Sequence, residues 1–409
     1  MLAAIRENLL IPLSLAVTLG ISAVMAEQVP VGTQIDAGNV EQYKSMLPTG
    51  SYVNVKAGQI LKVIPTTPLE QLVNPKWLEL TEANRGKAKM LDEAGTWGLA
   101  DGSFWPGGYP FPGTNDPREI MANFQYHITP DDLDSDPPGV PQAGFSLINS
   151  EGKEYKRFIV NLAIRRMSGR VWVPPLGAEP GYEGELYRNP TLFFEPYDSK
   201  GVMSLNVIYR DQAALPDAYV YVPVLRRVRR LSSSQRADPI QGSDLTAGDV
   251  DTFSDPLGMW DFKLLGTETL LINQNGPPPP EGMRDNGLQL VANYYPSPYT
   301  AVESRRVHII EATPRYNTIY SKKVLYVDSQ TYRPAVGEFY DRQGQLLKTY
   351  EVIWSVVKKG SRLSPNWSWV VIKNQQTGNA SVSWSFNVDT NVGTPLSRVL
   401  TSSMSESSR

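Results

Sequence analysis

Four separate segments of this chain alternate apolar and polar side chains with a period of two residues. They are RFIVNLAIR, VMSLNVIYR, KTYEVIWSV and SVSWSFNV, which begin at residues 157, 202, 348 and 381. Successive side chains of a β-strand point to opposite faces, so this pattern predicts strands with one buried face and one face in water. Few helical segments lie between residues 156 and 369, which disfavours βαβ units. The alternation therefore predicts an antiparallel sheet.

Local signals predict how some of these segments begin, end or connect. The segment FYDRQGQLLKTY predicts a hairpin with its turn at Asp341–Gly344. The segment PREIMANFQYHI follows Asp116, a residue type that caps helix N-termini, and predicts a short helix.

Changes in composition divide the chain into four parts. We expect a signal peptide over residues 1–26 and a helical and loop extension over residues 27–94. The strand pattern fills a curved-sheet domain over residues 95–390, which carries a Pro-rich loop at residues 275–287. The Ser-rich residues 391–409 are expected to form a flexible tail.

The N-terminal segment has the features of a secretory signal. Arg6 precedes an apolar run over residues 9–24, and the segment ends in Val24-Met25-Ala26. The run is short and contains a proline, so a cleaved signal is favoured over an uncleaved membrane anchor. The chain has no cysteine and so no disulfides. We therefore expect a soluble protein in the periplasm of a Gram-negative bacterium.

The residue inventory argues against most kinds of catalysis. The chain has two histidines, His127 and His308, and lacks the G-x-S-x-G motif of serine hydrolases. The segment DDLDSDPPG, which begins at Asp131, spaces carboxylates as a calcium loop does. However, it lacks the turn glycine and the final acidic ligand, and is interpreted as a solvated acidic loop. We expect a non-enzymatic protein without metal or cofactor, although a pair of hydrolytic carboxylates stays open.

An arginine-rich segment, VYVPVLRRVRRL, begins at Val220. At strand period each of its faces starts apolar and ends charged, which indicates one strand that runs from a buried region to a rim. The charges balance locally, because residues 226–255 hold five arginines and five aspartates. A basic address for nucleic acid or membrane would not be neutralised by its own neighbourhood. The whole chain has a formal net charge of −3, which also disfavours nucleic-acid binding.

Three ordered motifs resemble one family of exported bacterial proteins. They are VPVLRRVRRLSSSQRADPIQGSDLTAGDVDTFSDP, the earlier GGYPFPG followed by REIMANFQY, and the later YSKKVLYVDSQTYRPAVGEFYDRQGQLLKTYEVIW. Over roughly residues 95–372 the chain resembles the DUF1329 family, which is similar to the LolA/LolB-type outer-membrane lipoprotein-sorting proteins. The resemblance implies a mainly β (α+β) fold, an open incomplete antiparallel β-barrel wrapped over helices with an apolar cavity.

The same resemblance implies non-enzymatic carriage of a lipid or other hydrophobic ligand across the periplasm. It also implies two partners, an inner-membrane transporter of the resistance-nodulation-division (RND) type and an outer-membrane protein. Two alternatives stay open. The first is a non-catalytic adaptor of an envelope transport complex, and the second is a periplasmic carboxylate-dependent hydrolase.

Two sets of residues are candidates for contact with such a ligand. Arg227 and Arg229 are predicted to meet an anionic headgroup at the cavity mouth, or else to pair with Asp244, Asp249 or Asp251. The aromatic residues lie in segments rich in Gly and Pro or close to acidic residues, where they would form a lid or wall of the cavity or a plug of the sheet end. These aromatic candidates are Trp105, Tyr109, Phe111 and Trp260.

Overall fold

The computed structural model describes residues 29–135, 143–278, 290, 294–359, 362–385 and 388–407. The expected signal peptide therefore lies outside the described residues, as does most of the Pro-rich loop. The fold statements below concern the described part of the chain.

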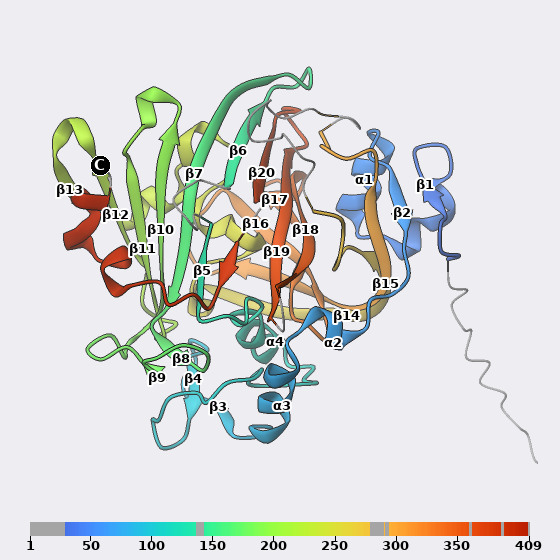
Figure 1. Ribbon diagram of the computed structural model, residues 1–409. Helices are drawn as coiled ribbons and strands as arrows, with labels where there is room; N and C mark the ends of the chain where they lie inside the picture. The colour runs from blue at the N-terminus through green and yellow to red at the C-terminus, as the bar shows by residue number, and fades with distance from the viewer. Residues whose placement is uncertain are drawn as a thin grey trace, which may run out of the picture.

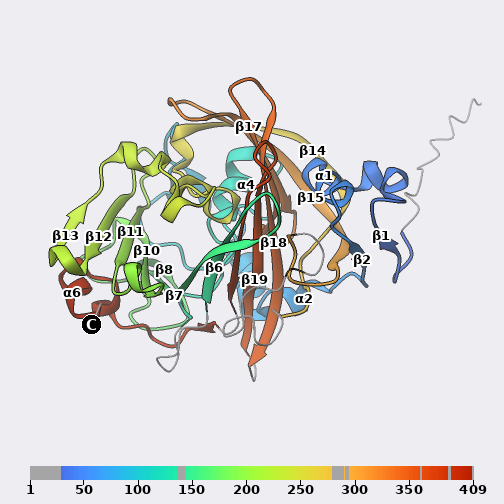
Figure 2. The same ribbon diagram turned by 90° about the horizontal axis from the view of Figure 1, so that it is seen from above.

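One large sheet dominates the fold, and each of its main strands pairs antiparallel with the next (Figures 1 and 2). From one edge to the other, the strands are β13 (Arg227–Arg230), β12 (Asp217–Val222), β11 (Met203–Tyr209), β10 (Glu185–Glu195), β7 (Glu154–Arg166), β6 (Ala143–Ile148), β20 (Ala380–Ser385), β19 (Arg362–Asn374), β18 (Leu346–Lys359), β17 (Pro334–Asp341), β16 (Tyr320–Asp328), β15 (Thr300–Pro314) and β14 (Trp260–Ile272). Among the described residues no pairing joins β13 to β14, so the sheet curves without closing. The predicted open, incomplete antiparallel barrel is confirmed.

Shorter strands extend this sheet or form small separate hairpins. They are β1 (Gln34–Ile35), β2 (Leu61–Val63), β5 (Asp132–Asp134) and β21 (Asp389–Thr390) on the large sheet, and the pairs β3 (Ala88–Met90) with β4 (Trp97–Leu99) and β8 (Ser168–Arg170) with β9 (Gly177–Ala178). β2 runs parallel to β15 and antiparallel to β1, so the N-terminal segment is built into the sheet.

The helices are short, and many are single 3₁₀ turns. The α-helices are α1 (Thr49–Lys56), α2 (Leu69–Leu72), α3 (Pro75–Ala83), α4 (Pro117–Phe124) and α6 (Met404–Ser407). The 3₁₀ turns are η1 (Val40–Met46), η2 (Tyr197–Ser199), η3 (Pro223–Leu225), η4 (Ser233–Ala237), η5 (Ile240–Gly242), η6 (Ala247–Thr252), η7 (Leu257–Met259), η8 (Leu396–Val399) and η9 (Thr401–Ser403).

The local sequence signals are confirmed. All four alternating segments form strands, in β7, β11, β18 and β20. The turn between β17 and β18 is closed by the amide of Gly344, which has φ of +77° and donates to the carbonyl of Asp341. Asp116 caps α4 by accepting hydrogen bonds from the amides of Arg118 and Glu119.

One half of the concave face is filled by aromatic and aliphatic side chains. Residues 69–128 and 253–260 pack there against the inner faces of β14–β19, and Figure 2 shows α4 on this inner side. Trp77, Tyr109 and Trp354 are at most 2% exposed within this core. These segments reach only one end of the other half, formed by β7 and β10–β12, where they contact Arg166, Leu186 and Tyr187.

The prediction of one buried and one wet face is wrong for β18, because the N-terminal segment covers its outer face. On that face Glu351 is only 3% exposed. Its carboxylate accepts hydrogen bonds from Ser51 Oγ at 2.9 Å, from Gln59 Nε2 at 3.0 Å, and from the hydroxyl of Tyr295. A buried polar group needs such partners, so this cluster holds the N-terminal segment on the sheet.

The C-terminal residues 391–407 are packed, although their composition predicts a loose tail. Val399 and Met404 are fully buried. Met404 packs with Leu205 and Tyr221 on the outer faces of β11 and β12, and the red ribbon in Figure 1 runs along this side. A few buried apolar side chains are enough to fix a tail that is polar on average.

Replacing Glu351 by glutamine is expected to change stability relative to wild type in the variant's favour as pH rises. Burial raises the pKa of Glu351 above its ordinary value, although the surrounding hydrogen bonds oppose this shift. As pH rises above about 4.5, the unfolded carboxyl ionises before the folded one, so wild-type stability falls by about 1.4 kcal/mol for each unit of the pKa rise. Glu351→Gln removes this cost and should gain stability over wild type between pH 4 and pH 7.

The measurement is the free energy of unfolding of both proteins in urea at pH 4, 5.5 and 7. Glu151→Gln, at an exposed turn, is the matched control and should show no such trend. A difference between Glu351→Gln and wild type that is constant with pH would contradict the expectation.

Candidate ligand-binding site

The unfilled half of the curved sheet holds a cavity of about 330 Å³, which we call the main cavity. Its floor is the inner face of β7 and β10–β12. The register places Asn189, Asn206 and Ala218 side by side on this face, and Val220 follows two residues later. These side chains are small or of medium size, so they leave space where larger ones would fill it. A volume of this size falls at the lower end of the roughly 300–1,000 Å³ of small-molecule sites.

Residues 231–254 form the opposite wall of the main cavity. Two capping boxes shape this irregular segment, one from Ser232 and Gln235 and one from Thr246 and Asp249. Leu231, Ile240 and Val250 supply apolar contacts to the wall, together with several polar side chains. The wall is therefore mixed, less apolar than the family resemblance implies.

A smaller hollow of about 80 Å³ adjoins the main cavity, and we call it the inner pocket. The two share wall residues, among them Ile164, Tyr187 and Val250. Arg166 lines the inner pocket and pairs across the strands with Tyr187, so their side chains lie on the same inner face. Burial raises the pKa of Tyr187 to about 12, so its hydroxyl keeps its proton.

Two more titratable groups, His127 and Asp251, line the inner pocket. Nδ1 of His127 lies 2.6 Å from the carbonyl oxygen of Phe124, which only accepts, so this nitrogen carries a proton. Nε2 of His127 lies 3.4 Å from Asp251 Oδ2. The imidazole of His127 and the carboxylate of Asp251 are therefore direct neighbours in the wall of the inner pocket.

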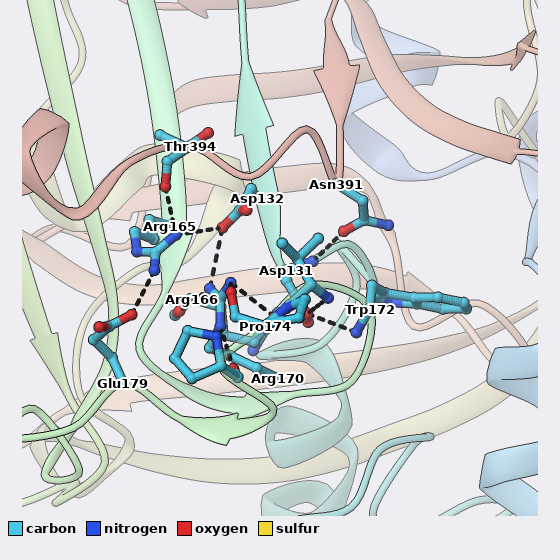
Figure 3. Close-up of polar contacts among 12 residues, drawn as sticks. Asp131, Asp132, Arg165, Arg166, Arg170, Trp172, Pro174, Glu179, Asn391 and Thr394 are labelled. Carbon is cyan, nitrogen blue, oxygen red and sulfur yellow. Dashed lines mark hydrogen bonds and ion pairs between the residues drawn. The ribbon is translucent and has the colours of Figure 1, made fainter.

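A buried polar network holds the segments around Arg166 (Figure 3). The carboxylate of Asp131 accepts hydrogen bonds of 2.7–3.1 Å from the amides of Val171, Trp172 and Val173. Asp131 is fully buried, so the interpretation as a solvated acidic loop is wrong for residues 131–135, while residues 136–139 of that segment lie outside the described residues. The donors come from residues 40 positions further along the chain, where a local acidic pattern cannot reveal them.

The neighbouring Asp132 binds two arginines of the same network. Its Oδ1 lies 3.1 Å from Arg170 Nη1 and 3.6 Å from Arg165 Nη1. Arg165 also pairs with Glu179. These contacts tie β5, β7 and the β8–β9 hairpin together at the end of the sheet where the inner pocket lies.

The arginine-rich segment forms a hairpin, so its interpretation as one continuous strand is wrong. Pro223–Leu225 makes a 3₁₀ turn and Arg226 has φ of +48°, which reverses the chain between β12 and β13. Proline has no amide to donate to a ladder, which favours a turn here. The reversal puts Arg227 opposite Val222 and Arg229 opposite Val220, so both lie on the cavity side of the edge strand.

The local balance of five arginines and five aspartates is not a set of ion pairs. Among the described residues, Arg236 pairs with Asp255 at 2.9 Å, whereas Arg230 pairs with Asp217, which lies outside that set. Asp249 is held by Lys323 and Lys348 instead. In the described part of the chain Arg227 and Arg229 make no ion pair, and both are exposed. Their contact with a ligand stays a prediction.

The four aromatic candidates lie apart from the main cavity, inside the packed core. Trp105 donates from Nε1 to the carbonyl of Gly108 at 2.7 Å, and Tyr109 donates its hydroxyl to the carbonyl of Thr331 at 2.9 Å. Phe111 packs against Trp97, and Trp260 donates to Asp255 Oδ2 at 3.1 Å. None of the four lines the main cavity or the inner pocket. Their predicted ligand contact has no support from their position.

The residues that the structure describes contain no group of three or more His, Asp or Glu side chains that could hold a metal ion. Within the same residues, no helix is long and apolar enough to cross a membrane.

A family model described as a protein of unknown function (DUF1329) matches residues 34–388. The chain belongs to the DUF1329 family. The match begins at β1 and so includes the N-terminal segment, which agrees with the place of β1 and β2 in the sheet of this DUF1329 protein. A search of curated proteins gives no match.

Three solved structures are similar to this DUF1329 protein. A Vibrio parahaemolyticus domain named for outer membrane lipoprotein sorting has a TM-score of 0.49 and 20% identity, and the likeness covers 70% of this chain and 97% of that domain. A DUF1329 family protein from Desulfovibrio piger has a TM-score of 0.49 and 18% identity, over 70% of this chain and 96% of its own. A LolA superfamily protein from Nitrosomonas europaea has a TM-score of 0.41 and 14% identity, and the likeness covers 68% of this chain and 94% of that protein.

Sequence reasoning missed Arg166 and Tyr187. A signal for Arg166 was present, because Phe158, Val160, Leu162 and Ile164 share one face of β7 and Arg166 continues it. A charged residue that continues an apolar face must either reach solvent or find a use inside the fold. Tyr187 has no comparable signal, since its partner on β7 is known only from the register.

Proposed function

We propose that this protein is a non-enzymatic carrier that binds a lipid or another hydrophobic molecule in the main cavity, in the periplasm. The observation that supports it is the cavity itself, a space of about 330 Å³ between the curved sheet and residues 231–254. Its apolar floor and wall side chains include Ile164, Ile208, Val220 and Ile240, which suit a chain or ring of hydrocarbon.

β13 is the exposed edge strand of the sheet and pairs with β12, whose inner face lines the main cavity, so we place the mouth of the cavity at this edge. Arg227 and Arg229 face this side and lack ion pairs in the described chain, which supports their predicted role toward an anionic headgroup at the mouth. An RND-type transporter and an outer-membrane protein as partners extend the same proposal to transfer between membranes.

A carboxylate-dependent hydrolase is not favoured by the environment of the wall carboxylates. Glycoside chemistry needs a carboxyl group that holds its proton near neutral pH and a second one that is free to act. Asp255, close to the main cavity, is engaged by Arg236 and Trp260, and Asp251 lies beside His127. The two carboxylates that line the main cavity are Asp238, which is exposed, and Asp251, which lies beside His127.

Filling the main cavity is expected to abolish binding of a hydrophobic probe. Ala218 lies on the inner face of β12, so Ala218→Trp places an indole where the ligand would lie. The affinity for a fluorescent acyl probe, measured by titration, should fall at least about tenfold, because the probe then loses more than about 1.4 kcal/mol of apolar contact.

Ala213→Trp, at an exposed position after β11, is the matched control and should bind the probe as wild type does. Equal affinity in both variants, or no probe binding by the wild-type protein, would refute the proposed carrier function. Mass spectrometry of lipid that co-purifies with the native protein gives an independent test.

A further inference from the structure

We propose that the inner pocket binds the carboxylate end of a long-chain acid, held by Arg166 and Tyr187. This inference rests on the proposed carrier function, and it adds the chemical class of the ligand and its direction of entry. The acid would enter with its charged end first, and its hydrocarbon chain would extend through the main cavity toward the mouth.

The first argument is the unpaired charge of Arg166. The residue is only 5% exposed, and in the described chain no carboxylate lies within 4.0 Å of its guanidinium. Nη2 donates to the carbonyl of Ile128 at 2.9 Å, whereas Nε and Nη1 are buried without a hydrogen-bond partner. Taking an ionised group out of water without a partner is strongly unfavourable, so the guanidinium is suited to an incoming anion.

The two neighbouring arginines, unlike Arg166, are neutralised by carboxylates of the same network. Arg165 and Arg170 lie within four residues of Arg166, and both are ion-paired with Asp132. Arg165 has a second partner in Glu179. Arg166 alone among the three lines a cavity, and it alone lacks a carboxylate partner among the described residues.

The second argument is geometric. The guanidinium of Arg166 lies 4.3 Å from the ring centroid of Tyr126, a contact that orients it at the pocket wall. Tyr187 lies directly opposite on β10, and no hydrogen bond of its hydroxyl is found in the described structure. A hydroxyl that keeps its proton can donate to the same anion. An inner pocket of about 80 Å³ suits a small carboxylate and leaves the hydrocarbon chain to the main cavity.

The pocket also contains Asp251, whose charge would repel an anion. Its Oδ2 lies 3.4 Å from Nε2 of His127 and more than 4.0 Å from Arg166, so it does not occupy the guanidinium. Arg236, on the wall of the main cavity, is paired with Asp255. Arg166 is therefore the cation that is left to an incoming ligand.

The experiment compares oleate with oleyl alcohol, two ligands with the same hydrocarbon chain. The full chain, freed of co-purifying lipid, is loaded with a fluorescent acyl probe, and each ligand displaces it in competition. Hydrogen bonds to a charged group correspond to roughly 10- to 100-fold in affinity. Wild type should therefore bind oleate at least about tenfold more tightly than the alcohol, and Arg166→Met should reduce this preference to within about twofold.

Further variants test the hydroxyl of Tyr187 and provide the controls. Tyr187→Phe removes only the hydroxyl and should lower the preference for oleate several-fold even if Arg166→Met does not fold. Arg85→Met, at an exposed position after α3, is the matched control and should keep the full preference. Arg229→Met tests the alternative position of the headgroup, at the mouth. Near-ultraviolet circular dichroism checks that each variant is folded.

The outcomes separate this inference from the proposed function. Equal binding of oleate and oleyl alcohol by wild type would overturn the inference and leave the carrier function standing. Loss of the preference in Arg229→Met, with Arg166→Met unchanged, would place the headgroup at the mouth and also overturn it. No binding of either ligand would overturn both.

Discussion

Asp131→Ala is expected to lower the free energy of unfolding by about 4 kcal/mol. The carboxylate accepts from three successive backbone amides, those of Val171, Trp172 and Val173. In the variant these amides lose a charged acceptor in a site where Asp131 is 0% exposed. Each buried amide that is left unsatisfied costs about 1–3 kcal/mol, and partial access of water to the opened site offsets some of this cost.

Urea unfolding monitored by tryptophan fluorescence measures this loss. The matched control is Asp101→Ala, which removes a carboxylate that accepts from the amide and hydroxyl of Ser103 at an exposed turn. We expect the control to lose less than about 1 kcal/mol, because water replaces the missing acceptor. Equal losses in the two variants would contradict the role given to the Asp131 network.

Asp249→Asn is expected to cost about 3–5 kcal/mol, the cost of removing one partner of a buried ion pair. Asp249 Oδ1 lies 3.0 Å from Lys323 Nζ, and Oδ2 lies 3.6 Å from Lys348 Nζ. The side chain of Lys323 is fully buried, and its ammonium lies 4.6 Å from the ring centroid of Phe339. With a neutral amide at position 249, two buried ammonium groups lose their counter-charge.

A double variant separates the ion pair from general damage at this site. Asp249→Asn combined with Lys323→Met removes both charges and keeps a side chain of similar length, so it should recover a large part of the loss. If the two substitutions are simply additive, the explanation by an uncompensated charge is wrong.

The contribution of Asp249 should also depend on pH. Burial by itself raises the pKa of Asp249, but Lys323, Lys348 and the hydroxyl of Tyr320 outweigh it and hold the pKa below its ordinary value. A lowered folded-state pKa gives stability that is fully present above about 3.8 and is lost as pH falls through the folded pKa. The difference between Asp249→Asn and wild type should therefore be constant from pH 5 to 7 and shrink in acid.

The ion pairs of the arginine-rich segment could not be predicted from the local sequence. Residues 226–255 contain five arginines and five aspartates, a composition that predicts mutual neutralisation. In the fold, Asp249 lies beside lysines of β16 and β18, and Arg230 lies beside Asp217 across the hairpin. Sequence distance is a poor guide here, because a curved sheet brings together strands that are a hundred residues apart.

The alternation pattern and local residue chemistry were enough to predict the strands of the sheet. The alternation in β7, β11, β18 and β20, the turn at Gly344 and the cap at Asp116 each depend on a few neighbouring residues. The three motifs were enough for the family, which the match over residues 34–388 confirms. These features are local or follow directly from the order of the residues, so they can be predicted without the tertiary structure.

The tertiary structure alone decided which half of the curved sheet is filled and which is hollow. Residues 69–128 pack under β14–β19, so the predicted aromatic wall residues Trp105, Tyr109 and Phe111 belong to the core. Arg166 and Tyr187 line the inner pocket in the hollow half, and they become neighbours only through the pairing of β7 with β10. Alternation assigns a side chain to a face, but the curvature of the sheet and the path of the packing segments determine what that face meets.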